Sequence, residues 1–220
     1  MKSKSVKIIA DLMLSAEVPQ FAKEELSRLM RIETMATKVS GFKMTDYVDS
    51  KSKGLRTALE GIFYDESGYE VATEGHILIY RKAEIPENFK NRIVLPNGEF
   101  VSENYRYPNW KAVVPNDAEF EPFIVDFDKV EDFAKDWKAK KKICGKVVQM
   151  ITFKNRYFNL DLFVKFIKAM KYAETNIIKL NPKNDTTPVS FGSYDNIGGL
   201  IMPMIPPTEK RMEENEIYAL

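Results

Sequence analysis

The sequence is poor in the residues on which catalytic and metal sites are usually built. Its 220 residues include one histidine, His76, and one cysteine, Cys144. A single cysteine cannot form an internal disulfide, which is typical of a protein of the reducing cytoplasm. His76 has Glu74 close by, but two residues do not make a catalytic triad, and no metal-ligand spacing surrounds either His76 or Cys144. We therefore expect no enzyme activity, no metal and no cofactor.

An excess of charge of one sign and long apolar runs are also missing. Lysine and arginine number 33 against 32 aspartates and glutamates, so the net charge of +1 does not by itself indicate nucleic-acid binding. No run approaches the ~18 apolar residues of a membrane-spanning helix. The N-terminal segment MKSKSVKIIADLML is interrupted by Asp11 and predicts a strand rather than a signal peptide. No membrane association is expected.

The hydrophobic pattern predicts an α+β protein of two tandem units, with antiparallel sheets and helices on one face. Domain boundaries are expected at 1–116 and 117–207, followed by a charged, flexible tail at 208–220. Helices are expected from Pro19 to Gly41, from a capping box at Asp128 and Glu131 to Lys142, and after a cap at Asn159 or Asp161. The buried face of the last helix is predicted to hold Leu160, Phe163, Phe166, Ile167 and Met170. Strands are expected at 5–14, 59–64, 69–73, 76–81, 92–95, 120–127, 147–153, 177–180, 189–194 and 199–204.

Two short segments carry the clearest local signals. Val71–Leu78 (VATEGHIL) places His76 directly after a Glu-Gly turn between two strand candidates, and Leu200–Met204 (LIMPM) is an apolar run containing a proline. His76 either packs in its turn or acts as a base. Met202 and Met204 form either an ordinary edge strand or an adaptable binding wall, because methionine is common at surfaces that accept several partners.

Basic side chains gather on the polar faces of all three predicted helices. They either form solvated faces or contact the phosphate backbone of double-stranded DNA without reading its sequence, because phosphates require positive charge and no fixed geometry. The DNA-facing candidates are Lys23, Arg28, Arg31, Lys138, Lys141, Lys165, Lys168 and Lys171.

Four segments in order resemble the bacterial DNA polymerase III beta sliding clamp family. The Leu-Asn-Gly strand of that family corresponds to Leu59-Glu60-Gly61, and its Ala-Thr-Asp-Gly-His-Arg-Leu turn corresponds to 72–78. Its Phe-Pro-Asp-Tyr segment corresponds to Tyr107-Pro108-Asn109-Trp110, and its terminal Met-Pro-Met to 202–204. The resemblance covers most of 55–205 and corresponds to the middle and last of three clamp domains, with the first domain absent. Ile77 departs from the family arginine, and the second helix of the first unit is missing between Leu95 and Tyr107.

The resemblance implies a pocket that binds short linear motifs of DNA polymerase and other replication proteins. It also implies a processivity or recruitment factor that encircles DNA, and two domains per chain would then require a homotrimer. The alternative is a monomeric clamp-like module that keeps the pocket without forming a ring. The C-terminal residues 216–220 either fray or fold into that pocket as a mimic of its ligand. Carried over by position, the pocket would be formed by Leu59, Thr73, Gly75, His76, Ile77, Leu78, Pro108, Val113, Leu200, Met202, Pro203 and Met204.

Overall fold

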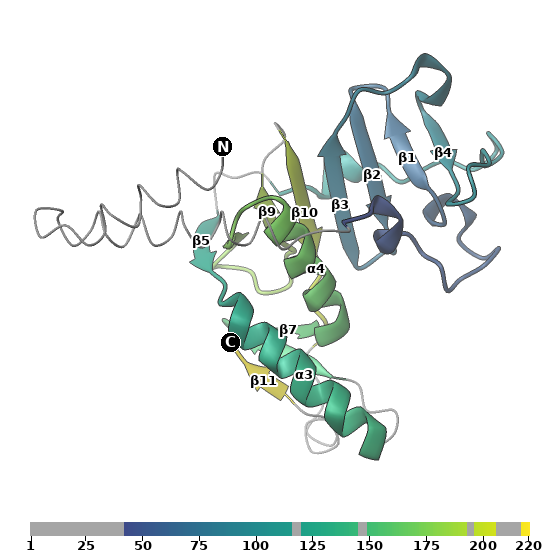
Figure 1. Ribbon diagram of the computed structural model, residues 1–220. Coiled ribbons are helices and arrows are strands. Elements are labelled where there is room, and N and C mark those ends of the chain that lie inside the picture. The colour runs from purple at the N-terminus through teal and green to yellow at the C-terminus, as the bar shows by residue number, and fades with distance from the viewer. Residues whose placement is uncertain (1–41, 116–119, 145–148, 193–195, 206–216) are drawn as a thin grey trace, which may run out of the picture. The chain divides into compact units, whose positions relative to one another are not determined.

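The computed structural model describes residues 42–115, 120–144, 149–192, 196–205 and 217–220 (Figure 1). The chain divides into two units, 1–41 and 42–220, and all the described residues belong to the second. The strand predicted at 5–14 and the helix predicted from Pro19 to Gly41 lie outside the described residues. Among the described residues, no helix is both long and apolar enough to cross a membrane.

The described residues form a mixed α+β structure, which confirms the predicted fold class. Its α-helices are α3 (Phe127–Cys144) and α4 (Leu160–Tyr172). Short 3₁₀ turns are η1 (Met44–Tyr47), η2 (Thr57–Leu59), η3 (Glu87–Phe89) and η4 (Trp110–Val113). The strands are β1 (Ile62–Asp65), β2 (Tyr69–Thr73), β3 (Ile77–Lys82), β4 (Arg92–Val94), β5 (Glu121–Ile124), β6 (Met150–Phe153), β7 (Arg156–Asn159), β8 (Ile177–Leu180), β9 (Val189–Gly192), β10 (Ile197–Ile201) and β11 (Ile217–Ala219).

One antiparallel sheet of eight strands, in the order β4-β1-β2-β3-β10-β9-β8-β5, runs through both halves of the described chain (Figure 1). The halves join where β3 pairs with β10, from Arg81 opposite Ile197 to Ile77 opposite Ile201. Gly199 is required at this joint, because an added Cβ would lie 2.8 Å from the carbonyl oxygen of Leu78. The domain boundary predicted after residue 116 falls among residues 116–119, outside the described residues, and stays a prediction.

The helix α4 follows the amphipathic pattern that its sequence predicts. Asn159 caps it by accepting a hydrogen bond from the Leu162 amide at 3.1 Å. Its buried residues include the whole predicted face, and α4 packs on β10 and on α3 (Figure 1). The cap of α3 differs from the prediction, since Asp126 rather than Asp128 accepts from a first-turn amide, that of Lys129, at 3.1 Å. The helix therefore begins at Phe127, two residues earlier than a cap at Asp128 would place its start.

The second sheet has the strand order β11-β6-β7, and two of its strands were not predicted. β6 and β7 form a hairpin whose turn residues, Lys154 and Asn155, both have positive φ. β11 pairs in parallel with β6, and the Tyr218 ring stacks on Phe133 with centroids 4.7 Å apart. Residues 217–219 therefore differ from the flexible tail predicted for 208–220 and pair with β6 instead of fraying. Residues 206–216 lie outside the described residues.

Candidate peptide-binding surface

Pairing of β3 with β10 brings the two signal segments of the sequence together. Leu78 lies opposite Leu200, and on its other side Leu78 lies opposite Thr73 of β2. Leu78 and Leu200 are buried and belong to one apolar cluster with Val71, Tyr80 and Trp110. The side chains of this cluster therefore meet on one face of the sheet. We call this face, together with the adjoining 73–76 turn, η4 and Met202, the β3–β10 surface.

The turn between β2 and β3 is held by hydrogen bonds of its own residues. The Thr73 hydroxyl donates to the carbonyl oxygen of Ile77 at 2.7 Å and accepts from the amide of Gly75 at 3.0 Å. Gly75 has a φ of 101°, a left-handed conformation that glycine adopts without steric cost. The carbonyl oxygen of His76 then accepts a hydrogen bond from the Met202 amide at 2.8 Å. This bond fixes Met202 directly beside the turn.

The side chain of His76 points to solvent and has one acidic neighbour. It is 65% exposed, and its Nδ1 lies 3.6 Å from Glu74 Oε1. No third group completes a triad around this pair in the contacts of the described residues. Nor do those residues contain a group of three or more His, Cys, Asp or Glu that could hold a metal ion. His76 is therefore an exposed side chain beside Glu74, at the turn between β2 and β3.

The remaining predicted pocket residues differ in accessibility. Met202 is 36% exposed and Val113 is 49% exposed, whereas Ile77 is completely buried and lies on the face of β3 opposite to Leu78.

Met204 donates its amide hydrogen to the carbonyl oxygen of Tyr157 at 2.6 Å and so continues the sheet edge towards β7. Leu59 ends η2, and Pro108 precedes η4. Membership of all twelve predicted residues in one pocket stays a prediction.

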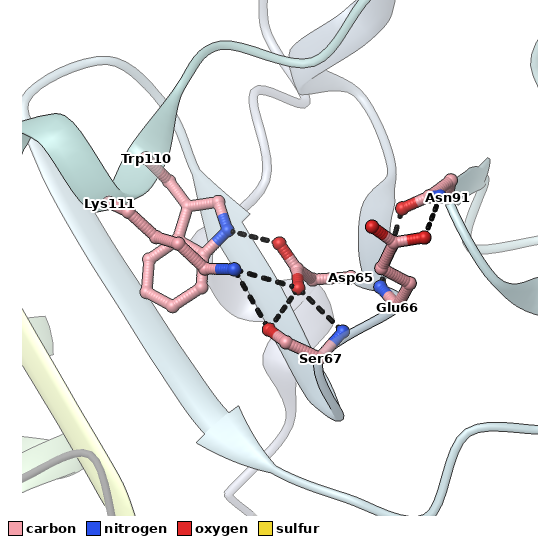
Figure 2. Close-up of polar contacts among 6 residues, drawn as sticks. All are labelled: Asp65, Glu66, Ser67, Asn91, Trp110 and Lys111. Atoms are coloured by element: carbon pink, nitrogen blue, oxygen red, sulfur yellow. Dashed lines mark hydrogen bonds and ion pairs between the residues drawn. The ribbon is translucent and has the colours of Figure 1, made fainter.

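Sequence reasoning missed the residues that hold η4 against the sheet. Trp110 is 2% exposed and packs with Leu78 and Leu200, and Val114 packs against the same cluster. The Trp110 indole donates to Asp65 Oδ2 at 2.9 Å, and Lys111 Nζ lies 3.1 Å from Asp65 Oδ1 (Figure 2). In the sequence, only the aromatic side chain of Trp110 could have indicated this contact. Asp65 is followed by Glu-Ser-Gly and looks like an ordinary turn residue.

Asp65 is the electrostatic anchor of this contact. Burial by itself raises its pKa, but hydrogen bonds from Ser67, Trp110 and Lys111 outweigh the burial and lower the pKa to about 2. The carboxylate therefore stays ionised and accepts from all three groups at neutral pH (Figure 2). A charged acceptor makes each of these bonds stronger than a neutral one.

The basic residues predicted to face DNA do not form one free surface in the described residues. On α4, Lys165 Nζ donates to the carbonyl oxygen of Asp46 at 3.0 Å, and Lys168 Nζ lies 2.9 Å from Asp46 Oδ2. Lys171 pairs with Glu131 of α3. Lys138 is exposed on α3. Lys141 belongs to the same helix, but its side chain is outside the described part of the structure. Lys23, Arg28 and Arg31 also lie outside the described residues.

No protein-family model matches the sequence, and no curated protein matches it. Solved structures of bacterial sliding clamps do match. The DNA polymerase III subunit beta of Borrelia burgdorferi, in complex with a natural product, is 17% identical with a TM-score of 0.47, over 80% of this chain and 63% of that chain. The Bartonella birtlesii clamp bound to griselimycin is 12% identical with a TM-score of 0.49, over 81% and 65% of the two chains. The Helicobacter pylori clamp bound to a DNA ligase peptide is 13% identical with a TM-score of 0.42, over 80% and 63%.

This chain thus spans slightly less than two thirds of the length of the clamps it matches. The resemblance predicted from the order of the sequence motifs is found again in solved structures, over about 80% of the chain. At these identities the likeness is one of fold alone.

Proposed function

We propose that the chain is a clamp-like replication factor that binds short linear motifs of polymerases and other replication proteins on the β3–β10 surface. The observation that supports this function best is the pairing of Leu78 with Leu200, beside the Met202–His76 hydrogen bond. These residues come from the two segments whose sequences most resemble the clamp pocket. Binding, rather than catalysis, is the activity proposed, since Glu74 is the only ionisable partner of His76 within the described part of the chain.

The chemistry of the surface suits an apolar peptide. Leu78, Leu200 and Trp110 provide a rigid apolar base, and Met202 provides an exposed, adaptable side chain at its edge. A bound peptide would place apolar side chains against this base and would find polar groups of the Thr73–His76 turn at the rim. The proposed ligand is therefore a short extended segment with two or more apolar side chains.

Ring formation is the second part of the proposal. Two clamp-like domains per chain would give six domains in a homotrimer, which would enclose double-stranded DNA and contact its phosphates without sequence preference. The alternative is a monomeric module that keeps the peptide surface alone. The partnered lysines of α4 favour this alternative, as does the lack of an α-helix among described residues 42–115. Native mass spectrometry at micromolar concentration separates the two, because only a trimer supports the ring.

Peptide binding is tested by Met202→Asp, which places a charge on the exposed rim. The control is Ile124→Asp on β5, at the far edge of the eight-stranded sheet, where the replaced side chain is 66% exposed. Fluorescence polarisation with a labelled copy of the Helicobacter pylori DNA ligase peptide is expected to show at least about tenfold weaker binding for Met202→Asp only, the loss of roughly one buried apolar anchor. Equal affinities of the two variants, or no binding by the unaltered protein, would reject the proposal.

A further inference from the structure

A cavity of about 530 Å³ lies beside β4 and adjoins the β3–β10 surface at Phe63 and Tyr107, which pack against its apolar cluster. Its walls come from β1, from the start of β4 and from the segment 101–107. A volume of this size is in the range of small-molecule sites, which is roughly 300–1,000 Å³. None of the pocket residues or basic residues predicted from the sequence lines it, so the proposed function leaves it unexplained.

The frame of the cavity is held in place by several independent contacts. Asn91, in a left-handed conformation with φ of 56°, donates from its side chain to Glu66 Oε2 at 2.9 Å (Figure 2). Its amide donates to the carbonyl oxygen of Tyr64 at 2.7 Å. The Val101 amide donates to the carbonyl oxygen of Ile93 at 2.9 Å. The cavity is therefore largely preformed, which lowers the cost of binding a ligand.

Positive charge dominates the lining. Lys90, Arg92 and Arg106 face a single acidic lining residue, Glu103. Arg92 Nη1 pairs with Glu103 at 2.8 Å, but its Nε is buried and has no hydrogen-bond partner among the described residues. Lys90 pairs with Glu87 at 2.6 Å, a surface pair that solvent weakens. Even with both acidic partners counted, the cations are in excess, and an unpaired buried N–H calls for an acceptor.

Aromatic side chains form part of the remaining wall, together with Asn91, Ile93, Val101 and Ser102. Phe63 and Tyr107 stack with their centroids 4.7 Å apart and planes within 10°, and the Tyr107 hydroxyl donates away from the pair to the carbonyl oxygen of Val71 at 3.3 Å. Tyr105 is 50% exposed, although it lines the cavity. Aromatic rings can stack on a nucleobase, and guanidinium groups next to them can bind the phosphate of the same nucleotide through charge and hydrogen bonds.

We infer that this cavity binds a nucleotide, with its base against Tyr105 and the aromatic wall and its phosphate at Arg92 and Arg106. Phosphate carries up to two negative charges and three acceptor oxygens, which suits the forked donors of arginine better than a lone carboxylate does. An acidic peptide would match the charge but not the aromatic wall. The nucleotide is either free or part of a single strand, since bases in a duplex stay stacked and paired.

The test uses the whole protein and fluorescein-labelled oligo-dT, followed by polarisation. Arg106→Glu reverses the one lining cation without an ion pair among the described residues, and Lys53→Glu is its control, an exposed lysine away from the lining. Tyr105→Leu keeps an apolar side chain but removes the stacking face. Each cavity variant is expected to weaken oligo-dT binding on the order of tenfold, and Lys53→Glu to leave it unchanged. Duplex DNA of the same length should show no difference among the variants.

Competitors identify the ligand class. Displacement of oligo-dT by dTMP supports a site for free nucleotide, and resistance to dTMP with sensitivity to unlabelled oligo-dT supports a site for a single strand. Inorganic phosphate or hexaglutamate that competes as well as dTMP would overturn the inference, because the aromatic wall would then contribute nothing. Binding by Arg106→Glu equal to that of Lys53→Glu would overturn it as well. A correct fold of each variant is verified by its circular dichroism and melting temperature.

Discussion

Around β3 and β10, strand pairing satisfies the backbone, and the apolar side chains of Met202, just after β10, and Val113, at the end of η4, stay exposed. On α4 the exposed ends of the charged side chains are instead held by other parts of the chain. Lys168 reaches Asp46 of η1, and Lys171 reaches Glu131 of α3. Both surfaces were expected from the sequence to bind a partner. Among the described residues, the first keeps Met202 and Val113 exposed, whereas Lys168 and Lys171 of the second are paired.

The difference shows that residue type alone is weak evidence for an interface. A lysine on a polar helix face looks the same in the sequence whether it meets a phosphate or a carboxylate of its own chain. Apolar side chains that stay exposed next to a buried cluster are stronger evidence for an interface, because folding usually buries apolar surface that lies beside the core. The β3–β10 surface is therefore the stronger candidate of the two.

The largest expected effect comes from breaking the joint on which that surface depends. In Gly199→Ala the new Cβ would collide with the Leu78 carbonyl oxygen at 2.8 Å and with the Ile79 side chain. The backbone of Leu78 cannot move away as a flexible side chain can. The free energy of unfolding should therefore fall by about 3 kcal/mol, which is the upper end of the usual cost of an overpacked core. Urea unfolding measures this loss, and peptide affinity should fall with it.

The matched control is Gly98→Ala. No atom lies within 4 Å of its added Cβ, so its cost is only the strain of a residue with φ of 89°, about 1 kcal/mol. If Gly199→Ala lost no more stability than Gly98→Ala, β3 and β10 would separate easily. The comparison between the β3–β10 surface and the basic face of α4 would then have no basis.

Local patterns predicted the elements that rest on neighbouring residues. The strand at 69–73 has the observed bounds of β2, and the apolar spacing from Leu160 to Met170 predicted the buried face of α4, because each pattern repeats with the period of its element. The residues around the site could not be found this way. Trp110 and Asp65 are 45 positions apart, and Lys168 and Asp46 are 122 apart. Such pairs depend on how the sheet assembles, and no local pattern encodes it.

The strands missed from the sequence have the same explanation. β7 is four residues between a turn and the Asn159 cap, so its alternation is too short to separate it from a loop. β11 exists because the edge of β6 is available to pair with Ile217–Ala219, which is a property of the folded sheet. The predicted order of the clamp-like motifs succeeded where these failed, because several short matches in sequence constrain one another.

A second prediction concerns the wall of the β3–β10 surface. The pKa of Asp65 is lowered from 3.8 to about 2, so the folded state prefers the ionised form. The stabilisation is complete above pH ~4 and is lost as the pH falls towards 2, because protonation then proceeds in the folded state as well. It amounts to on the order of 2 kcal/mol. Asp65→Asn should lose about this much stability at neutral pH and should unfold with a weaker pH dependence between 4 and 2.

Chemical denaturation at several pH values gives the difference between the two proteins. Other carboxylates titrate in the same range, among them Asp136, whose pKa is lowered by the Tyr218 hydroxyl and Lys140. They cancel in the difference because both proteins contain them. A gap between wild type and Asp65→Asn that stays constant from pH 7 to 2 would contradict the role of the Asp65 charge in holding Trp110 and Lys111.

The smallest effect tests the basic face of α4. Lys168→Glu replaces an ion pair by a repulsion with Asp46, and because both side chains are partly exposed the loss should be only about 0.5–1 kcal/mol. Lys138→Glu on α3 is the control, since Lys138 is exposed and has no ion pair among the described residues. Adding Asp46→Lys to Lys168→Glu should restore the stability, as measured by the melting temperature. If Lys168→Glu instead weakens retention of duplex DNA without lowering that temperature, Lys168 contacts DNA and does not stabilise the fold through Asp46 of η1. Both the β3–β10 surface and the basic face of α4 would then bind partners.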